Sequence, residues 1–173
     1  MNEAIAAANL TTLFYDPDTE PIRSFTGRWL FLSNFFTPAV LVFEGIEYQN
    51  SEAAFNAGKT VDPLVRRWVA AATTPAEAKT RGNNRTVVIL RPDWDNRVRY
   101  EVMNDVLHAK FLTHPVRTQA LLSTGNALLV EGNRHHDNVW GDCTCARPTC
   151  IAPGQNNLGR LLMALRAEVR ATT

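Results

Sequence analysis

The sequence has few cysteines and no long hydrophobic run. Its 173 residues include three Cys, and this odd number argues against a secreted scaffold held together by disulfides. Apolar runs such as residues 87–90 and 127–130 extend over only a few positions, too short to span a bilayer. The N-terminus, MNEAIAAANL, lacks the positive and apolar regions of a secretory signal. We therefore expect a soluble, cytoplasmic protein with no membrane partner.

Common catalytic motifs are absent as well. The chain contains no GxGxxG, Walker A, GxSxG or HExxH pattern, which removes the commonest nucleotide-fold, α/β-hydrolase and metalloprotease interpretations. Lysine is scarce, since 15 of the 18 basic residues are Arg. Genome composition is one explanation; the other is phosphate binding, because a guanidinium binds phosphate through two hydrogen bonds. The net charge of +1 excludes nucleic-acid binding by bulk charge alone, so we take Arg81, Arg85 and Arg91 as local phosphate candidates.

The order of elements predicts a single helix-rich α+β domain with a few short strands. Residues 1–24 are interpreted as a loosely ordered leader and residues 25–173 as the domain. The pattern predicts a hairpin near residues 40–48 and apolar strands at 86–90 and 127–131. Predicted helices start at Ser51, Asp62-Pro63, Thr74-Pro75, Asp93 and Pro115, and a last helix carries Leu158, Leu161, Leu162, Leu165 and Val169. Residues 132–156 form a long loop, and a long loop in a compact domain is typically functional.

The helix that opens at Ser51 carries the first candidate site. Glu52, Phe55, Asn56 and Lys59 recur at the spacing of one helical face. Glu52 and Lys59 are about 10 Å apart along the axis, too far for a direct ion pair but suited to two ends of one ligand. The alternative is an ordinary amphipathic helix, whose first turn favours an acidic residue.

The long loop carries the second and third candidates. Asp137, Trp140 and Gly141 offer a carboxylate, a flat stacking surface and a close backbone approach; the alternative is that Asp137 caps a turn and Trp140 lies in the core. His135 and His136 precede three cysteines, which sit at positions 143, 145 and 150. Three Cys and one His suit zinc, but no CxxC pair is present, so we assign no metal and no cofactor and leave metal binding by these residues open.

Read together, these segments resemble the NADAR (YbiA-like) superfamily. The matching segments are Phe31-Leu32-Ser33-Asn34-Phe35-Phe36, Glu44-Gly45-Ile46-Glu47-Tyr48, Ser51-Glu52-Ala53-Ala54-Phe55, Ala57, Lys59, Ala78-Lys79, Gly82, Asp93-Trp94, Met103, Lys110-Phe111, Leu121-Leu122, Thr124-Gly125, Leu129-Val130-Glu131, Asp137, Trp140-Gly141, Gly154, Asn156, Leu158-Gly159, Leu161-Leu162-Met163 and Arg166. They occur in the family's order and span residues 27–168. The chain departs from the family at Ala53, where many members have His, and in its longer, Cys-rich loop at residues 143–153. Both departures bear on the substrate more than on the reaction.

The resemblance implies hydrolysis of an N-glycosidic bond. Carried over position by position, it identifies Glu52, Lys59 and Asp137 as catalytic and Asn34, Phe35, Trp94, Trp140, Gly141 and Asn156 as substrate-binding. A carboxylate can stabilise the oxocarbenium-like transition state or position water, and two carboxylates can divide the roles of acid and base. The two Trp rings can stack on a base, and Asn156 can hydrogen-bond a ribose or phosphate oxygen. Lys59 either forms a Schiff base with a ring-opened ribose or pairs with a phosphate or carboxylate.

Three functions follow as hypotheses. The first is a hydrolase that removes ADP-ribose from ADP-ribosylated guanine, in DNA, in RNA or as a nucleotide. The second is a hydrolase of ribosylamino-pyrimidine phosphates from riboflavin synthesis. The third is a non-catalytic ADP-ribose binding module, which the presence of Glu52, Lys59 and Asp137 together argues against.

Overall fold

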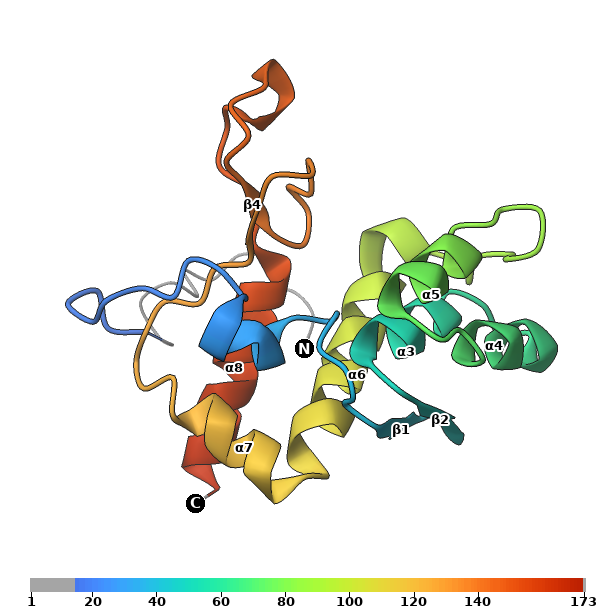
Figure 1. Ribbon diagram of the computed structural model, residues 1–173, viewed down its shortest axis with the longest axis horizontal. Coiled ribbons are helices and arrows are strands. Elements are labelled where there is room, and N and C mark those ends of the chain that lie inside the picture. Colours follow the sequence, from blue (N-terminus) through green and yellow to red (C-terminus); the bar gives the residue numbers. More distant parts are fainter. Residues whose placement is uncertain (1–14, 173) are drawn as a thin grey trace. The chain divides into compact units, whose positions relative to one another are not determined.

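The computed structural model describes residues 15–172 and divides the chain into two compact units (Figure 1). One unit is the middle segment, Leu30–Thr118; the other combines the described residues on either side of it, 15–29 and 119–172. We call them the central unit and the terminal unit. Helices dominate and the strands are short, so the predicted helix-rich α+β class is confirmed. No helix among the described residues has the length and apolar character needed to cross a membrane.

The central unit begins with a 3-10 helix and a short hairpin. The 3-10 helix η1 (Gly27–Leu32) leads from the terminal into the central unit. Strands β1 (Leu41–Phe43) and β2 (Ile46–Tyr48) pair antiparallel, with Leu41 opposite Tyr48. Glu44 and Gly45 form the two-residue turn with φ of 45° and 76°, the positive values that suit such a hairpin. The predicted hairpin is confirmed.

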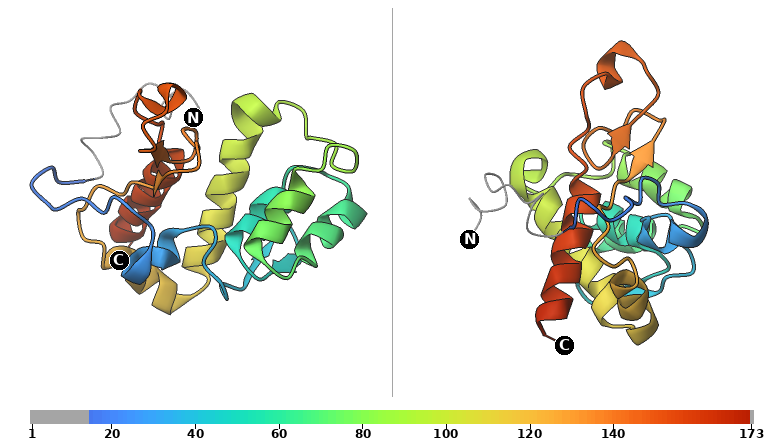
Figure 2. Two further views of the ribbon diagram at one scale, coloured as in Figure 1. Left: turned by 45° about the horizontal axis from the view of Figure 1, so that its top comes forward. Right: turned by 90° about the vertical axis from the view of Figure 1, so that its left-hand side faces the viewer.

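Three capped helices follow the hairpin. They are α3 (Ser51–Ala57), α4 (Pro63–Ala70) and α5 (Pro75–Gly82). The side chains of Asn50, Asp62 and Thr74 accept hydrogen bonds from backbone N–H groups in the first turn of the respective helices. The sequence predicts the caps at Asp62 and Thr74, and it leaves the first cap open between Ser51 and Asn50. Helix α3 packs against α4, α5 and α6 (Figures 1 and 2). This places the face predicted to carry Glu52 and Lys59 inside the unit.

Helix α6 (Arg99–Leu112) confirms the long predicted helix but corrects its start. A short π-helix, η2 (Trp94–Val98), precedes it. Asp93 has φ of 57° and its side chain caps no backbone N–H; its carboxylate instead accepts hydrogen bonds from the side chains of Asn96 and Arg97. The carbonyl of Asp93 accepts the N–H of Val98, which is the i→i+5 bond of a π-turn.

The predicted strand at residues 86–90 is wrong. No strand forms there: Val88 is buried, whereas Val87 and Ile89 are 40% and 80% exposed. A strand needs a partner that satisfies its backbone groups, and none of the described residues pairs with this run. The segment is a loop between α5 and η2 that is anchored by one apolar side chain.

The terminal unit is built around helix α8 (Asn157–Ala171), the long red helix in Figure 2. Helix α7 (Pro115–Leu122) leads into this unit; two parallel strands, β3 (Gly132–Asn133) and β4 (Asp142–Cys143), and the 3-10 helix η3 (Pro148–Cys150) precede α8. The predicted strand at residues 127–131 reduces to one isolated bridge, because its partner, Ile22, offers a single pairing residue next to Leu129. The apolar face predicted for α8 is buried at four of its five positions, and Leu161 is partly exposed.

Ile22 belongs to the segment predicted to be a loose leader. Its backbone N–H donates to Leu128 and its carbonyl accepts from Val130, each at 2.8 Å, and its side chain is buried. Asp16 donates a further backbone hydrogen bond to Asn126. Residues 15–24 are therefore tied to the terminal unit, while residues 1–14 of the predicted leader lie outside the described residues.

Candidate active site

Glu52 is a buried carboxylate in the first turn of α3. Asn50 caps the helix, and the backbone N–H of Glu52 donates to the carbonyl of Asn34 at 3.1 Å. Glu52 is only 8% exposed. A carboxylate in such a position needs hydrogen-bonding partners, because burial without them is costly.

Asn56 joins Glu52 to Lys59. Its Nδ2 donates to Oε1 of Glu52 at 2.9 Å and to the Glu52 carbonyl at 2.9 Å. Its Oδ1 accepts from Nζ of Lys59 at 2.6 Å, and the same ammonium donates to Oδ1 of Asn83 at 2.7 Å. The predicted face of α3 therefore forms one polar chain, Glu52–Asn56–Lys59–Asn83, which we call the Glu52–Lys59 network.

Gly82 allows this network to form. A Cβ at position 82 would overlap the side chain of Asn56, so α5 approaches α3 more closely here than any other residue type permits. Asn83 follows directly and reaches Lys59 from the end of α5. The contact between the two helices thus sets the position of the Lys59 ammonium.

The environment of Lys59 makes the neutral amine accessible near neutral pH. Burial, together with the positive charges of Arg85 and Lys79, lowers the pKa of Lys59 to about 8, although Glu52 and Asp95 act in the opposite direction. Roughly a tenth of a group with this pKa is unprotonated near pH 7. An amine poised in this way can act as a nucleophile.

Of the three predicted phosphate candidates, only Arg85 is unpaired. Arg81 forms an ion pair with Glu77 at 2.5 Å and donates to the Trp68 carbonyl. Arg91 pairs at 2.7 Å with Glu44, a carboxylate shared with Arg66. In the described part of the chain, Arg85 has no hydrogen-bond or ion-pair partner and is exposed. Its charge acts on Lys59, which makes it the Arg best placed to attract a phosphate there.

Two aromatic side chains near α3 differ in their exposure. Trp94 is 5% exposed, and its ring packs on Phe55 with centroids 5.5 Å apart. Phe35 is 40% exposed, and Nζ of Lys79 lies 5.8 Å from the centre of its ring. Phe35 therefore presents the more accessible stacking surface in the central unit.

Asn34 adds an unsatisfied acceptor to this region. Its Nδ2 lies 3.4 Å from the sulfur of Met103, but its buried Oδ1 has no hydrogen-bond partner among the described residues. The preceding carbonyl, that of Ser33, accepts from the fully buried Lys110 at 2.8 Å. A buried carbonyl oxygen without a partner is available to a substrate donor.

The terminal unit carries the second predicted carboxylate, Asp137. Its Oδ1 accepts from the N–H groups of Val139 and Trp140 at 3.1 and 2.8 Å, so it caps the turn that leads to Trp140. The alternative interpretation of this loop is therefore right for Asp137 but wrong for Trp140, which lies partly exposed and not in the core. Oδ2 accepts no hydrogen bond from the described residues. The Asx turn thus fixes the carboxylate and leaves one oxygen for chemistry.

Trp140, Gly141 and Asn156 are held by the backbone around them. Trp140 is partly exposed. A Cβ at Gly141 would overlap the Glu131 carbonyl, so the close approach that Gly141 permits is to the protein's own backbone. Oδ1 of Asn156 accepts from the Glu131 N–H at 3.0 Å, and its Nδ2 donates to the Leu129 carbonyl at 2.8 Å. Any contact of Asn156 with a substrate would add to these bonds.

The structure thus gathers Glu52 and Lys59, with Asn34, Phe35 and Trp94, in the central unit. It gathers the other four predicted residues, Asp137, Trp140, Gly141 and Asn156, in the terminal unit. Asn83 could not be predicted as a site residue, because it lies 24 residues from Lys59 and has no local signal in the sequence. Asn56 did carry a signal, because it shares the helical face with Glu52 and Lys59, but was not selected as a site residue.

Comparison with known proteins identifies the family. The NADAR domain, as a family, matches residues 13–170. The chain belongs to the NADAR domain family. An N-glycosidase from Nostoc punctiforme is 36% identical over 138 residues, which are 78% of this chain and 83% of that protein. N-glycosidase YbiA from Escherichia coli is 34% identical over 137 residues, 79% of each chain. These names confirm the predicted class, an N-glycosidase enzyme.

A second kind of relative and a solved structure complete the comparison. A riboflavin biosynthesis protein from Vibrio vulnificus is 32% identical over 157 residues, covering 91% of this NADAR chain but 38% of that protein. The NMR structure of Escherichia coli YbiA has a TM-score of 0.73 and 30% identity, covering 92% of this chain and 90% of YbiA. Both units of this NADAR protein therefore fall within one known fold.

Proposed function

We propose that this NADAR domain is a hydrolase that removes ADP-ribose from ADP-ribosylated guanine, in nucleic acid or as a nucleotide. The observation that carries the proposal is the Glu52–Lys59 network: a buried carboxylate linked through Asn56 to an amine with a pKa of about 8. The reaction needs a carboxylate near an anomeric carbon and a group that activates the leaving base.

The charges around Lys59 favour a substrate with two phosphates. Arg85 and Lys79 both act electrostatically on the buried Lys59, so two exposed cationic side chains lie near this amine. A diphosphate such as that of ADP-ribose complements this field better than a single phosphate does. Phe35, exposed beside Lys79, offers a surface on which a base can stack.

The proposed reaction uses Glu52 and Lys59 in sequence. A ribose attached to an exocyclic amine opens to an imine at C1′ as the ring oxygen gains a proton. The neutral Lys59 amine adds to C1′, and the C1′–N bond to guanine breaks as that nitrogen takes a proton. Water then hydrolyses the Lys59 Schiff base, which releases ADP-ribose and regenerates the Lys59 amine. Glu52 transfers the protons and Asn56 orients its carboxylate.

A direct displacement is the alternative route. In it, Glu52 positions water for attack on an oxocarbenium-like C1′, and Lys59 stays protonated and pairs with a phosphate. Asp137 stays a predicted catalytic residue in either route. One oxygen of its carboxylate accepts no hydrogen bond from the described residues.

Hydrolysis of ribosylamino-pyrimidine phosphates is the second candidate function. The Vibrio vulnificus relative named as a riboflavin biosynthesis protein supports it. This substrate also carries a ribose on an exocyclic amine, so the same carboxylate and amine would serve. It differs in having one phosphate and no nucleic-acid context.

Parallel assays of both substrates test the proposal. The purified protein is incubated with an ADP-ribosylated guanine oligonucleotide and, separately, with the ribosylamino-pyrimidine phosphate, and released ADP-ribose or ribose phosphate is measured. We expect release from the oligonucleotide. Release from the pyrimidine substrate alone would instead identify the protein as a hydrolase of ribosylamino-pyrimidine phosphates. Binding of ADP-ribose without turnover of either substrate would contradict both assignments and leave a binding module.

Borohydride trapping separates the two routes. Reduction during turnover would fix a Schiff base as a stable adduct, and the chain has only three lysines, so peptide mapping identifies the site without ambiguity. We expect an adduct at Lys59 that Lys59→Arg abolishes and Lys79→Arg preserves. Turnover without an adduct at Lys59 would remove the covalent route and leave the direct displacement.

A further inference from the structure

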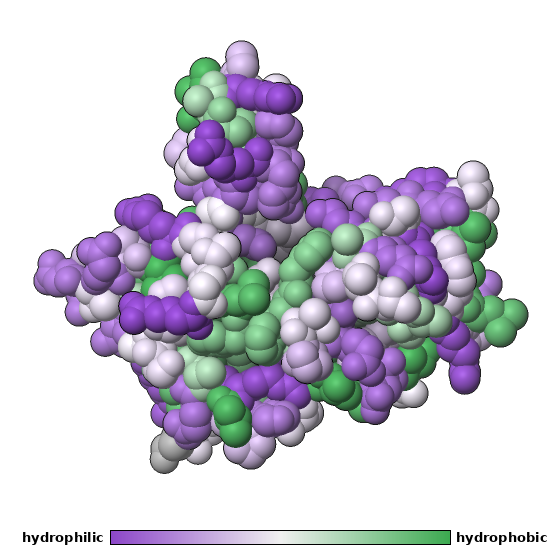
Figure 3. All heavy atoms as spheres, viewed as in Figure 1, coloured by the Kyte–Doolittle hydropathy of each residue, from purple (hydrophilic) through white to green (hydrophobic). Residues whose placement is uncertain are grey.

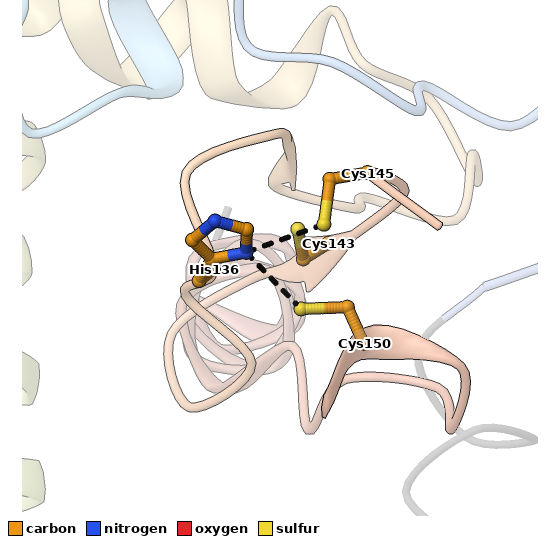
Figure 4. Close-up of side chains that lie close together, drawn as sticks. All are labelled: His136, Cys143, Cys145 and Cys150. Atoms are coloured by element: carbon orange, nitrogen blue, oxygen red, sulfur yellow. Dashed lines mark hydrogen bonds between the residues drawn. The ribbon is translucent and has the colours of Figure 1, made fainter. Parts of the chain in front are cut away.

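The cysteine-rich loop of the terminal unit brings four metal-binding side chains together. They are His136, Cys143, Cys145 and Cys150, and the three cysteines are free thiols. Their donor atoms all lie within 4.8 Å of one another. Figure 4 shows the three sulfurs and the His136 ring pointing toward one another from separate parts of the loop. The four residues lie within 15 positions of the sequence, but their spacing does not by itself predict that their side chains meet.

The two distances from His136 to cysteine sulfurs match those of a tetrahedral zinc site. Nδ1 of His136 lies 3.2 Å from Sγ of Cys145 and 3.4 Å from Sγ of Cys150. Zinc bonds of about 2.3 Å to sulfur and about 2.0 Å to nitrogen, at tetrahedral angles, put nitrogen and sulfur roughly 3.5 Å apart. Three thiolates and one imidazole form a closed donor set with no position left for a substrate, which is typical of structural rather than catalytic zinc.

The backbone is shaped to achieve this convergence. His136 and Ala146 have φ of 68° and 62°, values that are uncommon for residues other than glycine. His136 is itself one of the four donors, and Ala146 directly follows Cys145. Two such turns beside the donors indicate that the loop is built around them.

The loop has no hydrophobic core of its own. Between residues 134 and 156, Cys143 and Cys150 are buried, but no aliphatic or aromatic side chain is; Ile151 is 76% exposed. The segment around β4 is covered mainly by hydrophilic side chains (Figure 3). Segments that cannot bury enough apolar surface commonly depend on a metal or a disulfide for a fixed structure.

We propose that His136, Cys143, Cys145 and Cys150 bind one structural Zn²⁺ ion. Binding displaces the thiol protons into solvent and involves no redox change. Three thiolates and an imidazole are soft ligands that select zinc over hard cations. The filled d shell of Zn²⁺ imposes no preferred geometry, so the ion accepts a tetrahedral site. The ion would hold together β4, η3 and the turn at His136, which directly precedes Asp137.

Metal content is the direct test. The full chain, purified without added chelator, is measured for zinc per chain and for the rate of zinc transfer to a colorimetric chelator. We expect about one zinc per chain in the wild type and in His135→Ala, the adjacent histidine that lies outside the cluster. His136→Ala and Cys145→Ser should lose zinc at least about tenfold faster or retain none.

Cobalt substitution provides a readout independent of activity and of zinc retention during purification. Reconstitution with Co²⁺ should produce thiolate charge-transfer absorption and tetrahedral d–d bands that His136→Ala weakens and His135→Ala does not. A wild type that carries no zinc and shows no thiolate–cobalt absorption would overturn the proposal. So would a disulfide between two of the cysteines in unreduced peptides, or iron in place of zinc.

Discussion

At the scale of single residues, the most informative group is the Lys59 amine, because its two possible roles require different protonation states. As a nucleophile it must be neutral, and as a phosphate partner it must be protonated. Its pKa of about 8 lies close to the working pH of most enzymes, so either form is accessible. The pH dependence of activity therefore distinguishes the roles.

We predict that kcat/KM rises as the pH increases through about 8 and then levels off. The sign follows from the lowered pKa: below about 8 the amine is mostly protonated, and above it the nucleophilic form predominates. Initial rates from pH 6 to pH 10 measure this pH profile. Lys79→Arg, which keeps a positive charge at position 79, is the matched control and should show the same profile. A kcat/KM that falls over the same pH range would assign Lys59 to phosphate binding instead.

Asp137→Asn separates the two functions of the Asp137 side chain. The amide keeps an Oδ1 that can accept from Val139 and Trp140, so the turn should persist with a change in melting temperature of a few degrees at most. The charge is lost, and general acid–base roles contribute about 10²–10⁴-fold to rate. We expect kcat to fall within that range while circular dichroism stays unchanged. Full activity in Asp137→Asn would restrict this residue to capping the turn.

At the scale of elements, the contact between α3 and α5 controls the geometry of the Glu52–Lys59 network. Gly82 lets the helices approach, and Asn83 uses that approach to reach Lys59. The terminal unit repeats the pattern, since a Cβ at Gly141 or at Gly159 would overlap a backbone carbonyl. Several glycines of the family motif thus permit close packing rather than contact a ligand.

We predict that Gly82→Ala lowers activity more than stability. Ala is favoured over Gly in a helix by about 1 kcal/mol, whereas overpacking against Asn56 costs about 1–3 kcal/mol, so the net loss in the free energy of unfolding is modest. Displacing catalytic groups by a fraction of an ångström is more damaging, and we expect kcat/KM to fall at least about tenfold. Denaturant unfolding and initial rates measure both effects. The control is Thr80→Ala, which removes only a hydrogen bond to Ala76 on the exposed face of α5; equal activity in the two variants would contradict the packing argument.

Elements with strong local signals were predictable from the sequence. The hairpin at Glu44-Gly45 and the helix caps at Asp62 and Thr74 depend on neighbouring residues, so local patterns suffice. The strands expected at residues 86–90 and 127–131 were not correct, because an apolar run becomes a strand only when a partner lies beside it. That partner depends on contacts between distant parts of the chain.

At the scale of the whole molecule, the family motif contains two kinds of residue. Some carry the proposed chemistry, and others, such as Gly82 and Gly141, permit close packing of the backbone. Glu52 and Lys59 were identifiable because they share one helical face and because the family resemblance marks them. Asn83 was not, since the packing of two helices brings it to Lys59. The sequence shows that the loop contains one His and three Cys that could bind zinc. It does not show that their side chains meet, which happens in a folded loop with left-handed backbone conformations at His136 and Ala146.

The central claim is that the Glu52 carboxylate performs the chemistry of an N-glycosidase, and one comparison tests it most directly. Single-turnover cleavage of the ADP-ribosylated guanine oligonucleotide is measured for the wild type, for Glu52→Gln and for Glu47→Gln, which alters an exposed carboxylate of the same unit. We predict that Glu52→Gln reduces the rate by about 10²–10⁴-fold, while its melting temperature stays near that of the wild type and Glu47→Gln cleaves normally. Cleavage by Glu52→Gln at the wild-type rate would contradict the account.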